Sequence, residues 1–153
     1  MEEAGSIPLV GLTAWQALVE IGNVKKGQKV FIQAGSGGVG TFAIQLAKHF
    51  GAYVATTTSA ANIDWVKKLG ADLVIDYKVE DFETKLRDYD VVIHSNRDTK
   101  ILKKSLRILK PGGQLISLVG PPTPEFAEKI GLPWYLKFVT KLLSSGVKKK
   151  QKS

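Results

Sequence analysis

A glycine-rich motif is the part of this chain whose residue types and spacing point most directly to chemistry. It reads Gly35-Ser36-Gly37-Gly38-Val39-Gly40 and fits the pattern G-x-G-x-x-G. It follows an apolar run, 29–33, that predicts a buried strand, and it opens a helical pattern over 39–50. Glycines in this context permit a tight turn and let the backbone approach a pyrophosphate, which binds to the N-terminus of the helix. The motif therefore predicts a dinucleotide site. A P-loop is excluded, because Thr41 follows Gly40 directly and the required lysine is missing.

The residues that follow the second expected strand, 53–57, bear on which dinucleotide binds. An NAD site usually places Asp or Glu about 20 residues after the glycines, where the carboxylate holds the ribose hydroxyls. Here no acid occurs before Asp64, and Ser59 and Asn62 stand in its place. Hydroxyl and amide groups donate hydrogen bonds to a 2′-phosphate, which favours NADP. The same two residues also suit the role of helix caps, and no arginine is present there.

Apolar runs of strand length alternate with helical patterns along the chain, which is typical of parallel α/β folds. Strands are expected at 29–33, 53–57, 73–75, 90–94 and 114–119. Helices are expected at 12–21 (capped by Thr13), 39–50, 61–69, 80–87, 99–109, 125–130 and 134–143. Gly51 and Gly70 stand where helices should end, and Pro111-Gly112-Gly113 predicts a tight turn. We predict an α/β Rossmann fold, a doubly wound parallel sheet of order 3-2-1-4-5 with helices on both faces.

Composition argues against several other classes of protein. The 153 residues, 44% hydrophobic and 24% charged, are typical of one globular domain. Cysteine is absent and the two histidines lie far apart, so we expect no disulfide and no metal site. Neither a membrane-spanning run nor a signal peptide is recognisable, and we expect a cytoplasmic protein. Much of the net charge of +8 comes from lysines in the last six residues, and no alternation of aromatic and basic residues indicates nucleic-acid binding.

Four groups of residues resemble one known family. They are the segment 8–18; Gly37-Gly38-Val39-Gly40 with 43–47; Leu69-Gly70-Ala71-Asp72 with Val74-Ile75-Asp76-Tyr77; and Leu109-Lys110-Pro111-Gly112-Gly113. Together they make the chain similar to the coenzyme-binding domain of the medium-chain dehydrogenase/reductase superfamily. Within it, the chain resembles the zinc-independent, quinone oxidoreductase-like branch.

The resemblance implies NADPH as cofactor and hydride transfer to an electron-poor substrate such as a quinone or an enone. It implies that Gly37, Gly38 and Val39 contact the pyrophosphate. It further implies that the 2′-phosphate ribose is surrounded by Ser59, Asn62 and Tyr77, and that the residues nearest the nicotinamide end include Thr13, Val119 and Gly120. The full set of expected cofactor-binding residues is Gly35, Ser36, Gly37, Gly38, Val39, Gly40, Ser59, Asn62, Tyr77, Ser95, Val119, Gly120 and Thr13.

The chain also departs from the family pattern. Relatives usually read Asp-Thr-Val-Gly-Gly after the fourth strand, where this chain reads His94-Ser95-Asn96-Arg97-Asp98, and some carry a lysine in place of Asn62. We interpret His94 as a hydrogen-bonded histidine at a strand end rather than as a proton donor.

Family members also carry a catalytic domain before this segment and a sixth strand after it. We expect 1–153 to be a single dinucleotide-binding domain whose catalytic domain is missing. Its parts would be an N-terminal segment with a helix (1–22), a Rossmann core (28–120), and a helical segment with a basic tail (121–153). The chain alone should be inactive. The uncovered edge at 114–119 should promote homo-oligomers.

Two other functions remain open on the sequence. A module that senses the redox state of nicotinamide would need the same cofactor site without catalysis. An S-adenosylmethionine-dependent methyltransferase would share the sheet, but its usual acids before the glycine loop and after the second strand are absent. The expected partner is a small-molecule substrate, and the sequence does not identify catalytic residues.

Overall fold

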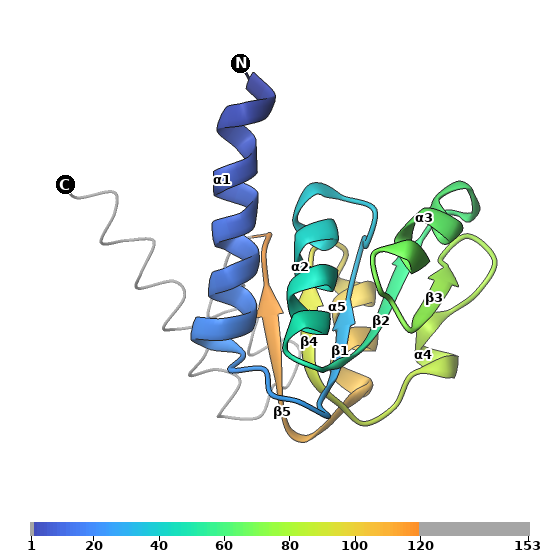
Figure 1. Ribbon diagram of the computed structural model, residues 1–153. Coiled ribbons are helices and arrows are strands. Elements are labelled where there is room, and N and C mark those ends of the chain that lie inside the picture. The colour runs from blue at the N-terminus through green and yellow to red at the C-terminus, as the bar shows by residue number, and fades with distance from the viewer. Residues whose placement is uncertain (1, 120–153) are drawn as a thin grey trace. The chain divides into compact units, whose positions relative to one another are not determined.

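Five strands form one sheet in the order β3-β2-β1-β4-β5, as predicted (Figure 1). The computed structural model describes residues 2–119. The strands are β1 (Lys29–Ile32), β2 (Tyr53–Thr58), β3 (Leu73–Asp76), β4 (Tyr89–His94) and β5 (Leu109–Ser117). β1 pairs in parallel with β2 on one side and with β4 on the other, and β2 pairs in parallel with β3. The chain reverses its winding direction at β1, which is where open α/β sheets place their ligands.

Helices connect the strands and cover both faces of the sheet, also as predicted. The helical segments are α1 (Glu2–Trp15), the π-helical turn η1 (Gln16–Ile21), α2 (Gly38–His49), the 3₁₀ turn η2 (Ala60–Asn62), α3 (Ile63–Lys68), α4 (Phe82–Lys85) and α5 (Thr99–Arg107). In Figure 1, α2 lies in front of the central strands and α5 behind them. Parallel strands covered in this way are buried on both faces, which explains their nearly continuous apolar sequence.

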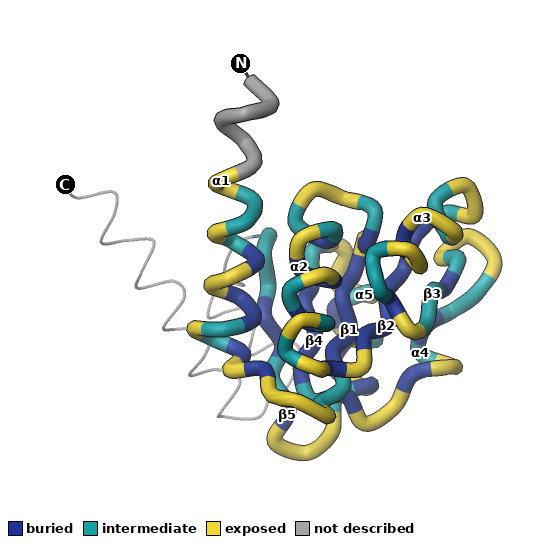
Figure 2. Tube along the Cα trace, in the orientation of Figure 1, coloured by how far each residue is buried: buried dark blue, intermediate teal, exposed yellow. Residues whose placement is uncertain are grey.

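The core is centred on β1 (Figure 2). Val30, Phe31 and Ile32 are fully buried. The ring of Phe31 packs against Phe82 of α4, with centroids 4.9 Å apart, and meets the edge of Tyr89 at 6.3 Å. Burial of the Tyr89 hydroxyl raises its pKa, so this residue serves the core as a neutral aromatic group.

Glycines and aspartates set the ends of several helices. Gly51 and Gly70 have φ values of +79° and +113°, which confirms their predicted place after α2 and α3. Asp81 and Asp98 are N-caps, because their side chains accept hydrogen bonds from Glu83 N and Lys100 N. Sequence reasoning did not assign these two caps.

The predicted boundary of the first helix is wrong. The helix begins at Glu2 instead of Leu12, and Thr13 lies inside it, where its hydroxyl donates to Leu9 O at 2.8 Å instead of capping. Pro8 and Gly11 lowered the expected helical propensity upstream. The helix nevertheless continues through both residues, because it packs along α2 and tertiary packing outweighs local propensity.

Three other elements differ from the predictions by more than one residue at a boundary. The helix expected at 80–87 is the single turn α4, because Leu86 is already extended, and α5 ends at Arg107 rather than at 109. β5 begins at Leu109 and includes the expected turn, whose Gly112 has a φ of +82°.

The chain divides into two compact units, 1–116 and 117–153. The helices expected at 125–130 and 134–143, together with the basic tail, lie outside the described residues.

Replacing the central aromatic residue tests this account of the core. Phe31→Ala should lower the free energy of unfolding by about 3–5 kcal/mol, because it leaves a cavity between β1 and α4. Val79→Ala is the control: Val79 is 78% exposed, and its loss should cost less than about 0.5 kcal/mol. Urea denaturation measures both, and equal losses would contradict the assignment of Phe31 to the core.

Candidate dinucleotide-binding site

The loop that leaves β1 is held in a fixed shape by backbone hydrogen bonds. Gly35 N donates to Thr57 O of β2 at 2.9 Å, and Gly37 N donates back to Ala34 O at 2.9 Å. Between these bonds Ala34 has a φ of +54°, in the left-handed region that non-glycine residues seldom occupy. The loop is thus tied to the neighbouring strand and turns sharply into α2.

Two of the three glycines of the G-x-G-x-x-G motif are required by packing. A Cβ at Gly35 would strike the side chain of Thr56 and lie 3.0 Å from Ile44 Cδ1. A Cβ at Gly40 would strike Ala34 O and lie 2.9 Å from Gly35 Cα. These glycines therefore let the first turn of α2 lie directly against the loop and against β2.

Gly37 has a different role. It is the N-cap of α2 with extended backbone, and a Cβ there would lie 3.2 Å from Ala34 O, a less severe contact than those at Gly35 and Gly40. The first hydrogen bond of the helix runs from Thr41 N to Gly37 O. The preceding N–H groups, those of Gly38, Val39 and Gly40, therefore point out of the helix end, where the helix dipole favours an anion. This cradle fits a pyrophosphate.

Ser36 adds a side-chain donor to the loop. Its Oγ accepts a hydrogen bond from the hydroxyl of Thr58 at 2.8 Å. The hydroxyl proton of Ser36 consequently remains available to a ligand oxygen. Thr58 is the last residue of β2, so this contact joins the glycine loop to the place where the specificity residues were predicted.

The structure brings the three predicted specificity residues to one edge of the sheet. Thr58 of β2 pairs with Asp76 of β3, and Tyr77 N donates to Thr58 O at 3.2 Å. Ser59 and Tyr77, which follow these two paired residues, thus stand at adjacent strand ends. Ser59 and Asn62 hold N-cap positions, but neither makes a side-chain cap bond; instead Asn62 Nδ2 donates to Ser59 Oγ at 3.3 Å. Neither side chain therefore caps a helix. The hydroxyl proton of Ser59 and the second amide proton of Asn62 can be donated to a ligand.

A pocket of about 610 Å³ opens at the carboxyl ends of the strands. Its lining comes from the ends of β1, β2, β3 and β4 and from α4 and α5: Gln33, Ala34, Thr57, Tyr77, Lys78, Val79, Glu80, Asp81, Phe82, Ser95, Asn96, Ile101 and Lys104. It adjoins the glycine loop through Ala34 and contains Tyr77, which is 59% exposed. Its size and apolar-rich lining suit a flat heteroaromatic ring.

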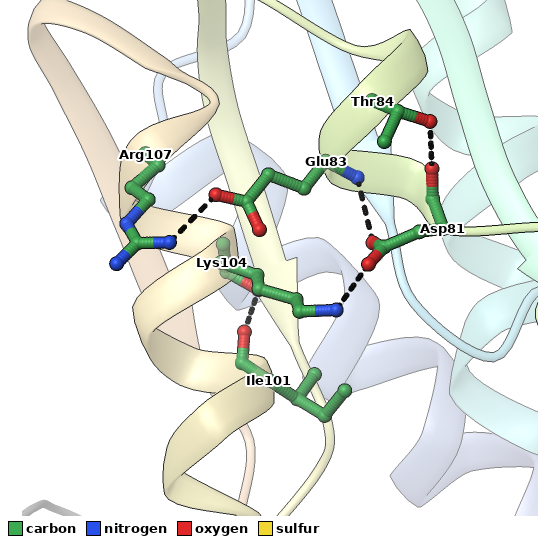
Figure 3. Close-up of polar contacts among 7 residues, drawn as sticks. Asp81, Glu83, Thr84, Ile101, Lys104 and Arg107 are labelled. Carbon is green, nitrogen blue, oxygen red and sulfur yellow. Dashed lines mark hydrogen bonds and ion pairs between the residues drawn. The ribbon is translucent and has the colours of Figure 1, made fainter.

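Ion pairs fix the wall of this pocket (Figure 3). The Asp81 carboxylate pairs with Lys104 of α5 and accepts from Glu83 N at 3.1 Å, while Glu83 pairs with Arg107 at 2.9 Å. The hydrogen bond from Lys104 holds the pKa of Asp81 below its ordinary value, so the pair persists at neutral pH. These contacts fasten α4 to α5.

Gln33 is a buried residue at this site that sequence reasoning missed. Its amide nitrogen donates to Ser105 Oγ of α5 at 2.8 Å, and its amide oxygen accepts from Ser95 N at 3.1 Å. It thereby joins the ends of β1 and β4 to α5, and it places the predicted residue Ser95 on the pocket wall. The signal in the sequence was a polar residue at the end of an otherwise apolar strand.

His94 at the end of β4 matches the sequence interpretation only in part. It is 2% exposed, and burial lowers its pKa, so the imidazole is neutral at neutral pH. Its Nδ1 has no hydrogen-bond partner among residues 8–119, whereas a hydrogen bond with the backbone of Asn96 acts on the pKa in the opposite direction to burial. It does not line the described pocket.

The residues predicted near the nicotinamide belong to different parts of the chain. Thr13 lies on α1 and does not line the pocket. Val119 belongs to the second unit, and Gly120 lies outside the described residues. Their roles remain predictions.

Comparison with known proteins identifies the family. Residues 38–142 match the family model described as "Zinc-binding dehydrogenase". An NADPH-dependent alkenal/one oxidoreductase of Arabidopsis thaliana, a chloroplastic protein, is 39% identical over 124 residues, which cover 80% of this chain and 31% of that protein. The chain spans about a third of the length of the curated relatives it matches.

Solved structures show the same relationship. The quinone oxidoreductase from Coxiella burnetii matches with a TM-score of 0.70 and 35% identity, over 90% of this chain and 47% of that one. The nucleotide-binding subdomain of the enoylreductase domain of PpsC from Mycobacterium tuberculosis matches with a TM-score of 0.70 and 28% identity, over 88% of this chain and 76% of that one.

The chain therefore belongs to the zinc-binding dehydrogenase family and carries the coenzyme-binding domain of the medium-chain dehydrogenase/reductases. Members of this family are NAD(P)H-dependent oxidoreductases. Within residues 2–119, no group of three His, Asp or Glu side chains is placed to hold a metal ion, and no helix is long and apolar enough to span a membrane.

A substitution at Gly37, the second glycine of the G-x-G-x-x-G motif, should separate binding from folding. Gly37→Val should retain the fold but weaken NADPH binding by roughly a hundredfold, because the side chain would fill the space where the backbone meets the pyrophosphate. Gly40→Val should instead unfold the domain, since its Cβ strikes backbone. Circular dichroism melting and fluorescence titration distinguish the two, and unimpaired NADPH binding by Gly37→Val would show that the phosphates bind elsewhere.

Proposed function

We propose that this chain binds NADPH in preference to NADH and serves hydride transfer to a quinone or an enone in a complete medium-chain reductase. The observation that carries the cofactor preference is the carboxyl end of β2. Ser59, Asn62 and Tyr77 gather there and present neutral donors, and no carboxylate occupies the place where an NAD site holds the ribose hydroxyls. Quinone and enone substrates are supported by the relatives, since one is an alkenal/one oxidoreductase and another a quinone oxidoreductase.

The residues of this chain would act by binding and orientation. The N–H groups of Gly38, Val39 and Gly40 and the hydroxyl of Ser36 would hold the pyrophosphate, and the pocket beside Tyr77 would take the adenine. The bound cofactor supplies the hydride. Fixing its two phosphates and its adenosine would limit where the nicotinamide can lie, which is the positional contribution a coenzyme domain makes to catalysis.

The domain organisation is part of the proposal. We infer that 1–153 acts as one dinucleotide-binding domain and meets its small-molecule substrate together with a catalytic domain. Self-association through β5 and a cytoplasmic location remain predictions.

Introducing a carboxylate at the end of β2 tests the preference. Ser59→Asp should weaken NADPH binding by roughly tenfold or more, because a carboxylate repels the 2′-phosphate, while NADH binding is retained or improved. Ser59→Ala is the matched control, which removes the hydroxyl without adding charge and should weaken NADPH binding less. Calorimetric titration of both variants with both cofactors provides the measurement.

Two outcomes would contradict the proposal. One is a wild-type chain that binds NADH as tightly as NADPH. The other is a Ser59→Asp variant with an unchanged ratio of the two affinities.

A further inference from the structure

The charged side chains that line the pocket are not all neutralised. Four of them are present, Lys78, Glu80, Asp81 and Lys104. Asp81 pairs with Lys104, and Glu80 pairs with Lys85 at 2.6 Å. Among residues 8–119, whose side chains the structure describes, Lys78 makes no ion pair. The described lining therefore carries one cation that no protein carboxylate balances.

The backbone places this cation beside the specificity residues. Tyr77 N donates a hydrogen bond to Thr58 O, which joins the ends of β2 and β3. Lys78 is the next residue along the chain. A turn fixes the backbone on both sides of Lys78, because Val79 N and Glu80 N both donate to Asp76 O, at 3.2 and 2.9 Å. The side chain borders the pocket together with Thr57 of β2.

The nearest carboxylate on this turn is engaged with the backbone. Asp76 Oδ1 accepts a hydrogen bond from Lys78 N at 3.0 Å. The Asp76 carboxylate thus stabilises the turn that presents Lys78, and the ammonium group at the far end of the side chain is exposed and available to a ligand.

The other candidate donors at this edge carry no charge. Ser59, Asn62 and Tyr77 offer hydroxyl and amide groups, whereas the 2′-phosphate of a dinucleotide carries close to two negative charges at neutral pH. Charge-assisted hydrogen bonds are roughly twice as strong as neutral ones. A site built from neutral donors alone would discriminate weakly between a phosphate and a hydroxyl.

We propose that Lys78 is the specificity-determining cation of this site and binds the 2′-phosphate of NADPH through its ammonium group. The inference rests on the proposed NADPH function and adds the residue that supplies its charge. Lys104 is less suited to the role, because Asp81 already neutralises it. Lys78 would thus account for the NADPH preference in a chain that has no arginine between the end of β2 and the start of α3.

The test compares ligands that differ in the 2′-phosphate. Calorimetric titrations with NADPH, NADH and adenosine 2′,5′-bisphosphate are made on the full chain and on Lys78→Gln. The variant should bind NADPH and the bisphosphate roughly tenfold more weakly, with NADH affinity unchanged within about twofold. The salt dependence of NADPH binding should also decrease, because one phosphate contact is lost. Lys78→Arg should retain the preference, since it keeps the charge.

Lys103→Gln is the matched control, because Lys103 is exposed on α5, does not line the pocket, and its loss changes the net charge equally. An equal effect of Lys103→Gln would indicate a general electrostatic field and overturn the proposal. The proposal would also be overturned if Lys78→Gln weakened NADPH and NADH binding equally, or if it weakened the binding of neither cofactor. If the wild type itself shows no preference for NADPH, the proposed function fails; if the wild type prefers NADPH and Lys78→Gln keeps the ratio, this inference alone fails.

Discussion

The close contact between the first turn of α2 and the loop that leaves β1 is the constraint on which the site depends. Gly40 lies so near Ala34 and Gly35 that no side chain fits between them, and Gly35 is similarly enclosed by Thr56 and Ile44. This contact points the free N–H groups of the helix into the opening at the end of β1. The reversal of winding between β1 and β4 keeps that opening clear of a crossover connection. The same glycines therefore serve packing and ligand access together.

A second set of contacts extends the site from the glycine loop toward the sheet edge. Thr58 contributes twice, since its hydroxyl bonds to Ser36 and its carbonyl accepts from Tyr77 N. The ends of β1, β2 and β3 are thus coupled through one residue. Gln33 makes the corresponding connection from β1 to β4 and α5. Both residues position others, and both lie at strand ends where the apolar pattern gives way to polar side chains.

Much of the fold follows from local signals in the sequence. The alternation of apolar runs with helical patterns predicted the five strands and their order, and Gly51 and Gly70 correctly predicted the ends of α2 and α3. The start of α1 was missed because Pro8 and Gly11 are poor helix formers, and only packing against α2 explains the continuous helix. The turn at Pro111-Gly112-Gly113 was predicted, but its inclusion in β5 was not. That inclusion depends on the pairing of β5 with β4, which cannot be inferred from the local sequence.

The site was predicted less completely than the fold. The glycine loop, Ser59 and Asn62 were predicted from their spacing after strands that end at the same edge, whereas Tyr77 was predicted only from the family resemblance. The wall built from Asp81 and Lys104 was not found, since it joins residues from two helices that approach only in the folded chain (Figure 3). The exposed charge of Lys78 was missed for a similar reason: its significance depends on which neighbouring charges are already paired.

The central claim is that the phosphates bind at the N-terminus of α2 and at the ends of β2 and β3. Amide chemical shifts of the isotope-labelled chain, recorded with NADP⁺ and with NAD⁺, test it most directly. The account predicts that both ligands shift the amides of Gly37 to Gly40, and that NADP⁺ shifts those of Ser59, Asn62, Tyr77 and Lys78 by more than NAD⁺ does. Shifts that avoid the glycine loop, or identical shifts at the ends of β2 and β3 with the two ligands, would contradict it.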